Sequence, residues 1–408
     1  MPLFLADNHL DDRRKIHPTV WALGFVSLLM DISSEIIHSL LPVFLVSVIG
    51  ASVQTVGLIE GVAEATAMVT RVFSGSLSDW LGKRKILAMT GYGLGALSKP
   101  LFALASSSSM IFSARFIDRV GKGIRGAPRD ALVADVTPPE QRGAAYGLRQ
   151  SLDSVGAFAG PLLAIGLMIL TGNQFRLVFW IALIPGLLAV AVLFFKVKEP
   201  VTIAGKNFRS PLSRQSLALL DRRYWLVVLI GTIFTLARFS EAFLLLRAEN
   251  VGLNISLIPL ALVTMNVAYS LTAYPVGRLS DRIGRQGLLA MGLIVLIGSD
   301  VLLALAGGVW LFFAGAALWG LHLGLTQGLI SALVADAVSP EVRGTAFGVF
   351  GLATGLALLL ASLLAGWLWQ KFGAPATFWS GALIASFALI GFLILHQSEI
   401  VHSAKSHR

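Results

Sequence analysis

The feature that most constrains this chain is a succession of long hydrophobic segments, which runs through nearly all of its 408 residues. Hydrophobic residues make up 56% of the sequence, charged residues only 13%, and the mean hydropathy is +0.78. A helix of about 20 apolar residues is long enough to cross the hydrocarbon core of a bilayer. The composition therefore predicts an all-α membrane protein and excludes an ordinary soluble globule.

We predict twelve transmembrane helices that form two six-helix bundles. The predicted spans cover residues 19–47, 54–78, 85–107, 109–134, 143–170, 176–196, 223–247, 254–279, 286–306, 308–336, 344–370 and 374–397. The longest break between spans is basic and contains several Pro and Ser residues, which is typical of a linker. We therefore expect an N-terminal bundle in residues 1–196, a cytoplasmic linker in 197–222 and a C-terminal bundle in 223–408.

The net charge of +10 is explained by membrane topology. Nineteen of the 32 Lys and Arg residues fall in segments that we place on the cytoplasmic side, and only Arg176, Arg247 and Lys371 fall in loops on the other side. This distribution follows the positive-inside rule. It predicts a multi-pass protein of the cytoplasmic (inner) membrane with both termini in the cytoplasm, and we expect no binding of nucleic acid.

An internal repeat supports the fourth span, which hydropathy alone would not identify. Residues 131–147 and 332–348 are identical at eleven of seventeen positions, and residues 75–83 similarly match residues 277–285. The fourth span carries many charges, whereas its counterpart in the second half of the chain is an apolar helix. The repeat predicts that both cross the membrane as pseudo-symmetric equivalents. The charged helix must then face protein or water rather than lipid.

Charged side chains are concentrated inside the first bundle. Asp31, Glu35 and His38 recur at intervals of four and three, so they share one face of the first helix. A charge at the centre of a membrane helix costs about 2.5–3.5 kcal/mol, which excludes contact with lipid. Further candidates for a proton-coupling and substrate cavity are Glu60, Glu64, Arg71, Arg115, Asp118, Arg119, Lys122, Arg125, Arg149, Asp153, Arg238, Glu241 and His322.

Two interpretations of these charges stay open. In the first, Asp31 or Glu35 carries a coupling proton, because burial favours a neutral carboxyl group and nearby cations favour a charged one. In the second, the charges form a permanent ion-pair network between helices. The cationic stripe on the fourth span suggests an anionic substrate, whereas the carboxylates of the first span suggest a lipophilic, cationic one.

At the basic loops the sequence resembles the major facilitator superfamily, and the resemblance extends over essentially the whole chain. "GSLSDWLGKRK" at 75–85 is similar to the family's loop motif between helices two and three, except at Trp80, and "GRLSDRIGR" at 277–285 is a second copy. The resemblance implies a cytoplasmic gate that holds the halves together when the site opens outward. The gate residues that it implies are Gly75, Asp79, Gly82, Lys83, Arg84, Arg142, Gly277, Asp281, Arg282, Gly284, Arg285 and Arg343.

Two further motifs of the same family concern proton coupling. In the fourth span Arg119 and Gly123 are in register with an Arg-containing motif, although Lys122 stands where the family usually has Gln. In the fifth span the spacing resembles the antiporter motif of drug–proton exchangers, without its last two glycines. The matching residues of the fifth span are Gly147, Gly156, Gly160 and Pro161.

We therefore predict a secondary active transporter that works by alternating access, with proton-coupled export (antiport) of a small molecule as the preferred function. The first alternative is proton-coupled uptake of an anionic solute such as an organic acid, an organophosphate or a siderophore, and the second is a membrane sensor. Because no phosphate-binding glycine loop and no metal-ligand pattern occurs, we expect no enzyme activity, no cofactor and no metal. The expected partners are a small-molecule substrate, protons and the lipid bilayer, with the proton gradient as energy source and the protein as a monomer.

Overall fold

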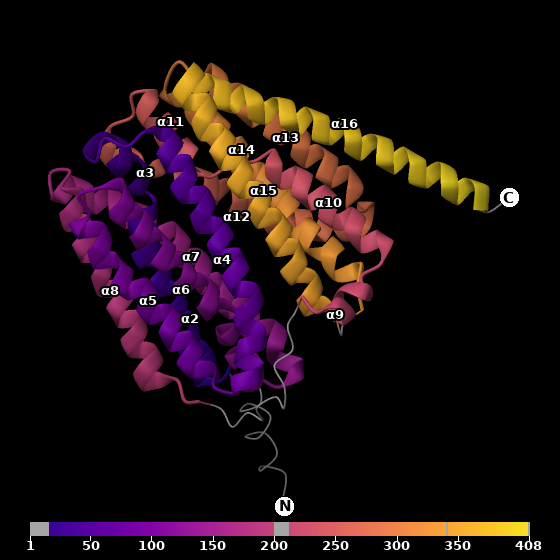
Figure 1. The fold of residues 1–408 in the computed structure, drawn as a ribbon, viewed down its shortest axis with the longest axis horizontal. Coiled ribbons are helices and arrows are strands. Elements are labelled where there is room, and N and C mark those ends of the chain that lie inside the picture. Colours follow the sequence, from indigo (N-terminus) through magenta and orange to yellow (C-terminus); the bar gives the residue numbers. More distant parts are fainter. Residues whose placement is uncertain (1–15, 200–211, 340–341, 407–408) are drawn as a thin grey trace, which may run out of the picture.

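The structure is a computed structural model that describes residues 16–199, 212–339 and 342–406. These residues form two groups of helices, which we call the N-terminal half and the C-terminal half (Figure 1). The N-terminal half contains α2 (Pro18–His38), α3 (Leu41–Val43), a π-helical turn (Phe44–Val48), α4 (Val53–Leu81), α5 (Arg84–Leu104), α6 (Ser108–Asp135), a 3-10 turn (Pro139–Gln141), α7 (Arg142–Leu170) and α8 (Phe175–Lys196). After the short α9 (Arg214–Ala218), the C-terminal half contains α10 (Arg222–Leu236), α11 (Ala242–Asn250), a 3-10 turn (Ile255–Leu257), α12 (Leu260–Ile283), α13 (Gln286–Leu305), α14 (Val309–Asp336), α15 (Arg343–Phe372) and α16 (Ala374–Ser406).

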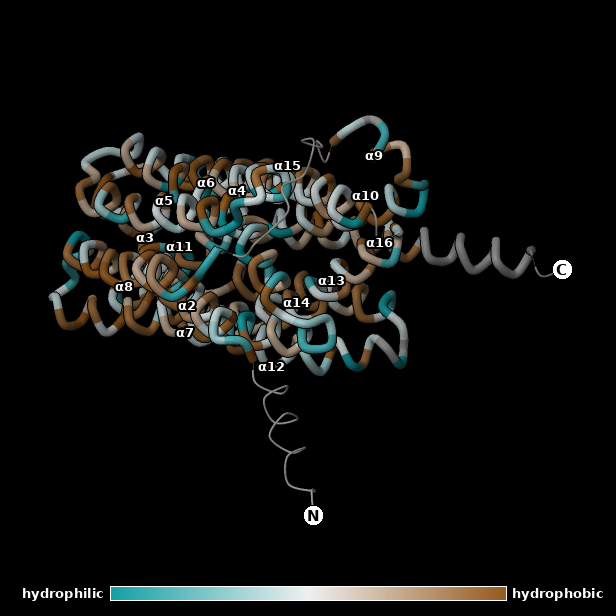
Figure 2. Tube along the Cα trace, turned by 90° about the horizontal axis from the view of Figure 1, so that it is seen from below, coloured by the Kyte–Doolittle hydropathy of each residue, from teal (hydrophilic) through white to brown (hydrophobic). Residues whose placement is uncertain are grey.

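The predicted fold is confirmed, since each predicted span coincides with a helical segment to within a few residues, except that α16 continues nine residues beyond the predicted end at 397. Eight of the segments are long and apolar enough to cross a membrane on length and composition alone, and hydrophobic residues colour much of the tube in both halves in Figure 2. The charged helix α6 is continuous from Ser108 to Asp135, as the repeat predicted. The bundle boundaries and the linker stay predictions, and residues 200–211 of that linker lie outside the described residues.

The first span of each half is interrupted, which the sequence analysis did not anticipate. In the N-terminal half α2 ends at His38, and α3 begins at Leu41 after a break of two residues, with Pro42 near its start. Proline has no amide hydrogen to donate to the preceding turn. In the C-terminal half α10 ends at Leu236, and the backbone NH of Ser240 donates to Ser362 Oγ at 3.2 Å instead of continuing the helix.

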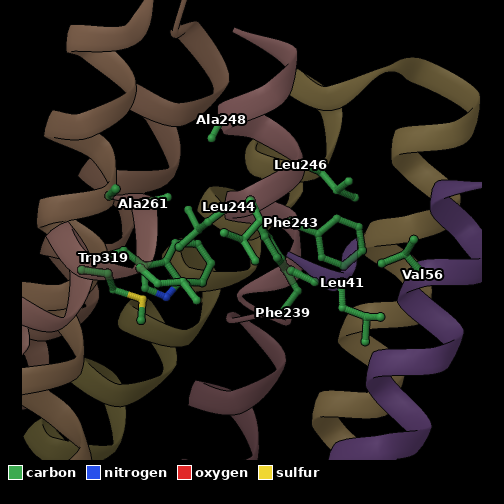
Figure 3. Close-up of a cluster of buried hydrophobic side chains, with 14 of the residues drawn as sticks. Leu41, Val56, Phe239, Phe243, Leu244, Leu246, Ala248, Ala261 and Trp319 are labelled. Atoms are coloured by element: carbon green, nitrogen blue, oxygen red, sulfur yellow. The ribbon is translucent and has the colours of Figure 1, made fainter. Parts of the chain in front are cut away.

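At one end the two halves are joined by an apolar plug. Its labelled side chains in Figure 3 include Leu41 and Val56 from the N-terminal half and Phe243 and Leu246 from α11 of the C-terminal half, and each of these four is at most 3% exposed. All four belong to one continuous hydrophobic cluster that spans both halves. We call this end of the molecule the closed end.

Hydrogen bonds between the halves reinforce the closed end. Ser47 Oγ donates to Glu249 Oε1 at 2.5 Å, and Ser256 Oγ donates to Asn173 Oδ1 at 2.6 Å. The basic loops 82–85 and 284–285 lie at the other end of the same helices, which we call the basic end. The halves are therefore tied together opposite the basic loops.

A second contact between the halves runs along α4 and α15, and we call it the seam. A Cβ atom on Gly366 would lie 3.0 Å from Gln54 Cα near the closed end, one on Gly61 would lie 3.1 Å from Leu359 Cα, and one on Gly348 would lie 3.0 Å from Val72 Cγ1 toward the basic end. Glycine at these positions lets the two helices approach closely. The seam therefore holds the halves together on one side over most of the helix length.

Candidate functional site

A cavity of about 580 Å³ lies between the halves, on the basic-end side of the plug. Its walls come from α2, α4, α6 and α7 of the N-terminal half and from α12 and α14 of the C-terminal half. The charged lining residues are Asp31, Glu35, Glu64, Arg71, Lys122, Arg125, Arg129, Asp130, Arg149 and Asp153. All ten belong to the N-terminal half, whereas the polar lining residues of the C-terminal half are neutral: Asn266, Tyr269, Ser270 and Gln327.

The deepest charges form a chain of contacts across α2, α4 and α6. Glu35 Oε2 lies 3.4 Å from His38 Nδ1, and His38 Nε2 lies 3.7 Å from Glu60 Oε2. Arg115 Nη2 then donates to the same Glu60 oxygen at 2.6 Å. Because Glu60 and Arg115 are both almost completely buried, each charge depends on the other for its stability in this position.

A second chain of contacts links α5, α6 and α4. Lys99 Nζ donates to Asp118 Oδ1 at 2.9 Å, and Asp118 Oδ2 lies 3.4 Å from Arg119 Nε. Arg119 Nη1 in turn lies 3.1 Å from Glu64 Oε1 at the cavity wall. Lys99, Asp118 and Arg119 do not line the cavity, so these residues bind one helix to the next.

A third group of ion pairs lies nearer the basic end, where α6 meets α7. Arg149 Nη1 donates to Asp153 Oδ2 at 2.6 Å, and Arg149 Nε lies 3.7 Å from Asp130 Oδ1. Arg129 lies 3.2 Å from Asp130 Oδ1 and 3.6 Å from Asp153 Oδ1. The two cations and two carboxylates thus balance each other.

Four charged side chains of the cavity do not belong to any of these three groups of contacts. Among the residues that the structure describes, Asp31, Arg71, Lys122 and Arg125 form no ion pair and no hydrogen bond through their side chains. Arg125 stacks on Tyr92, with its guanidinium carbon 5.0 Å from the ring centroid, and its buried Nη1 atom has no hydrogen-bond partner. The cavity therefore presents three cations and one carboxylate without direct partners.

The glycines of the fifth-span motif lie against the acidic face of α2. A Cβ atom on Gly156 would lie 2.8 Å from the Leu28 carbonyl oxygen and 2.9 Å from Asp31 Cβ, and one on Gly160 would meet Glu35 Cβ. A Cβ atom on Gly147 would meet no atom within 4 Å. Two of the three glycines therefore make room for the turns of α2 that carry the carboxylates, and Pro161 continues α7 beside them.

The C-terminal candidates do not line the cavity, which corrects their assignment to its wall. His322 is 2% exposed and its Nδ1 atom lies 2.8 Å from the Gly292 carbonyl oxygen, so it packs between α13 and α14. Arg238 and Glu241 lie at the break between α10 and α11, and both interact electrostatically with Glu64 of the N-terminal half. Helix packing and the break in the seventh span explain why these polar groups face protein.

At the basic end the ion pairs repeat within each half. Arg84 lies 3.1 Å from Asp135 and 3.3 Å from Asp79, and Arg285 lies 2.5 Å from Asp336. These ion pairs, which involve predicted gate residues, therefore connect segments of the same half. The gating role itself stays a prediction, and the remaining gate cations are exposed: Lys83, Arg142, Arg282 and Arg343.

The glycines of the two loop motifs have different structural roles: one in each motif ends a helix, and the other lies within the helix. Gly82 and Gly284 end α4 and α12 with positive φ angles of 61° and 83°, a conformation that favours glycine. A Cβ atom on Gly75 would lie 3.4 Å from Ala127 Cβ, whereas one on Gly277 would meet nothing within 4 Å. Gly277 therefore makes no close approach to another helix, because α12 is exposed there; the side chain of Asp281 lies outside the described residues.

Several residues of the site were not predicted from the sequence. Lys99 and Tyr92 on α5 contact Asp118 and Arg125, but a single Lys and a single Tyr in an apolar span give no periodic signal. The polar face of α12 could have been found, because Asn266, Tyr269 and Ser270 have the i, i+3, i+4 spacing of one helix face.

Comparison with known proteins agrees with the fold and extends over the whole chain. The Major Facilitator Superfamily family model matches residues 23–246 and 239–408. An uncharacterized MFS-type transporter of Methanocaldococcus jannaschii is 34% identical over 404 residues, covering 96% of this chain and 97% of the relative. The quinolone resistance protein NorA of Staphylococcus aureus is 23% identical over 295 residues, covering 71% and 74% of the two chains.

A solved structure shares the same architecture. A bacterial homolog of the human lysosomal transporter Spinster, in an inward-facing and occupied conformation, superposes with a TM-score of 0.78 at 16% identity and covers 93% of this chain and 96% of that chain. The likeness shows the fold alone, whereas the family match and the M. jannaschii relative show common descent. The chain therefore belongs to the Major Facilitator Superfamily and is a multi-pass membrane transporter rather than an enzyme.

Proposed function

We propose that this transporter moves an organic anion together with protons, and that Asp31 is the proton-binding group. The observation that carries the proposal is the imbalance among the unpaired groups of the cavity. Arg71, Lys122 and Arg125 have no carboxylate partner, and only Asp31 has no cationic partner. An anionic substrate supplies the negative charge that these cations lack.

Asp31 is better suited to exchange a proton than the other acids of the first bundle. Glu60 lies 2.6 Å from Arg115 and Glu64 lies 3.1 Å from Arg119. Glu35 lies 3.4 Å from His38, so each of these three carboxylates already has a partner. Asp31 has no such contact, yet it lies beside the cavity and interacts electrostatically with Asp153 of α7 and with three cations of α6, Lys122, Arg125 and Arg129.

This arrangement couples the two ligands with a definite sign. An anion that binds Lys122 and Arg125 neutralises the cations that stabilise the charged form of Asp31. Proton binding to Asp31 then becomes more favourable, and a neutral Asp31 in turn repels the anion less. Anion and proton therefore bind cooperatively, which is the requirement for symport.

Proton-coupled export by antiport is the second candidate. The spacing of the fifth-span glycines and the similarity to a quinolone resistance protein favour it. In that case a lipophilic cation and a proton compete for Asp31, so the substrate displaces the proton instead of promoting its binding. The two candidates thus predict opposite proton movements at the same residue.

We also propose the orientation and the energy source. Because the basic loops 82–85 and 284–285 follow the positive-inside rule, we place the basic end in the cytoplasm, with both termini on that side and the proton gradient across the cytoplasmic membrane as energy source. The cavity then opens toward the cytoplasm and the plug closes the outer side. No cofactor or metal ion takes part, and a monomer contains all parts of the proposed site.

The experiment has two steps. The purified transporter is first screened by thermal shift against organic anions and lipophilic cations, and we expect the stabilising compounds to be anions. Proton exchange on binding of the best compound is then measured in weakly buffered solution. We expect uptake of about one proton by the wild type and none by Asp31→Asn, because Asn cannot titrate.

The control is Asp79→Asn at the basic end, where the carboxylate side chain is 70% exposed and lies outside the cavity. This variant should take up protons like the wild type. Stabilisation by cations only, with proton release that Asp31→Asn abolishes, would establish antiport instead. Unchanged proton uptake in Asp31→Asn would remove this residue from coupling.

A further inference from the structure

The cavity adjoins an apolar crevice that opens sideways between the halves. The crevice has a volume of about 650 Å³ and lies between α7 and α12. Ser154 and Phe158 of α7, together with Asn266 and Ser270 of α12, line both the cavity and the crevice. A molecule can therefore occupy both spaces at once.

The crevice differs in chemistry from the cavity. Apart from the shared residues, its walls are the aliphatic side chains Val155, Leu162 and Leu163 of α7, with Val267 and Leu271 of α12, and the small Ala159. The five larger side chains are each at least 40% exposed. Both helices belong to segments that are apolar enough to span a membrane, so these side chains face the hydrocarbon region.

The position of the crevice follows from the seam. The halves pack closely along α4 and α15, and the opening lies on the other pair of facing helices. A fully hydrated anion in the cavity would be exposed to hydrocarbon through this opening, which is unfavourable. An apolar chain in the crevice would fill the opening with matching chemistry.

From the shared lining of these two adjoining spaces we infer that the substrate is a single-chain anionic amphiphile of the membrane. Its anionic headgroup, a carboxylate or a phosphate, binds near Arg71, Lys122 and Arg125, and its alkyl chain lies in the crevice between α7 and α12. The neutral polar side chains of Ser154, Asn266 and Ser270 surround the junction of head and chain. The inference rests on the proposed function and narrows its substrate to a class.

The test is equilibrium binding to the full-length protein in nanodiscs of zwitterionic phosphatidylcholine, without a proton gradient. The probes are radiolabelled dodecyl phosphate and butyl phosphate, and empty nanodiscs provide the correction for partitioning. We expect dodecyl phosphate to bind at least about tenfold more tightly than butyl phosphate, since burial of additional methylene groups is favourable. Dodecyltrimethylammonium should not compete.

Two substitutions separate the roles of crevice and cavity. Val267→Trp fills the crevice and should weaken dodecyl phosphate binding by about tenfold while leaving butyl phosphate binding unchanged. Val69→Trp is the matched control, because Val69 and Val267 are both 40% exposed and Val69 lies on α4, away from the crevice. Lys122→Gln should weaken the binding of both phosphates.

The outcomes distinguish this inference from the proposed function. Equal affinities of the two phosphates, or equal effects of Val267→Trp and Val69→Trp, would overturn the placement of the alkyl chain while leaving an anion carrier intact. No binding of either phosphate, or displacement of bound dodecyl phosphate by dodecyltrimethylammonium, would overturn the anionic headgroup. The binding experiment in nanodiscs does not measure proton coupling. An error in the proposed coupling at Asp31 would therefore be seen only in the proton-exchange experiment.

Discussion

The two halves of the molecule share a frame but differ in their interiors. At the basic end Arg84–Asp135 in the first half and Arg285–Asp336 in the second join equivalent helices, although Arg285 aligns with Lys83 in the repeat. The first span is interrupted in both halves as well. The cavity is asymmetric, because all of its charged lining residues come from the N-terminal half.

The comparison separates two kinds of constraint on a duplicated chain. Helix ends, loop glycines and the ion pairs beside them recur, because both halves must place the same helices in the same order. The side chains of the interior can differ between the halves once one half supplies the charged groups. The C-terminal half contributes only neutral polar side chains to the cavity, among them Asn266 and Gln327. Symmetry of the fold therefore does not imply symmetry of the chemistry.

The largest effect that tests this comparison is expected at Arg115. Arg115→Met leaves Glu60 buried without its closest cation, and loss of one partner of a buried pair costs about 3–5 kcal/mol. Thermal and denaturant unfolding of the purified protein should show the loss, while Arg115→Met combined with Glu60→Leu should recover much of it. Arg285 lies at the more exposed basic end of the C-terminal half. If Arg115→Met lowers the free energy of unfolding no more than Arg285→Ala does, the buried charges of the N-terminal half do not contribute more to stability than the exposed ones.

An intermediate effect is expected where glycines separate helices. Gly156→Ala should destabilise the protein by about 1–3 kcal/mol, because the added methyl group meets the backbone of α2 beside Asp31. In the other half, a Cβ atom on Gly355 would lie 3.1 Å from the flexible Met68 Sδ atom, so Gly355→Ala should cost less. Unfolding midpoints of the two variants provide the measurement.

Gly147→Ala is the control for both glycine substitutions. It adds a methyl group in open space, and alanine is favoured over glycine in a helix by about 1 kcal/mol. It should therefore leave stability unchanged or raise it slightly. A loss at Gly147 as large as that at Gly156 would show that the contact between α7 and α2 does not determine the cost.

The smallest effects are expected for the repeated pairs of the basic end. Arg84→Ala and Arg285→Ala should each cost at most about 1 kcal/mol, because partly exposed ion pairs contribute little. The loss should be larger for Arg84, whose side chain is less exposed and contacts two carboxylates. Salt at 1 M should reduce the loss of stability in both variants, because it screens exposed charges. Unfolding measured over a series of salt concentrations tests this. A larger loss of stability for Arg285→Ala than for Arg84→Ala would contradict the expected order.

Most of the fold could be predicted from the sequence, because long apolar runs and an internal repeat depend on local composition. The repeat even identified α6 as a span despite its charges. The break between α10 and α11 could not be predicted, since no proline marks it and the backbone NH of Ser240 is satisfied by Ser362, a residue far along the chain. Hydrogen bonds between distant segments leave no local pattern.

The candidate site was predictable in part. Helical periodicity correctly grouped Asp31 and Glu35 on one face, and both line the cavity. Periodicity could not show which charges are paired, because pairing depends on distances between helices; thus Asp118 binds Lys99, and His322 contacts α13, instead of facing the cavity. The distinction between a structural and a functional charge appears only in three dimensions.

The close packing of α4 against α15 has a consequence for how the molecule can change shape. The contact involves backbone atoms at the closed end and in the middle, and the Val72 side chain toward the basic end. It leaves little room for sliding or separation, so relative movement of the halves is confined to rotation about an axis near this contact. Points far from such an axis travel furthest. The gap between α7 and α12 therefore changes width more than any part of the opposite side, and the same rotation that narrows the cavity also squeezes the sideways opening beside it.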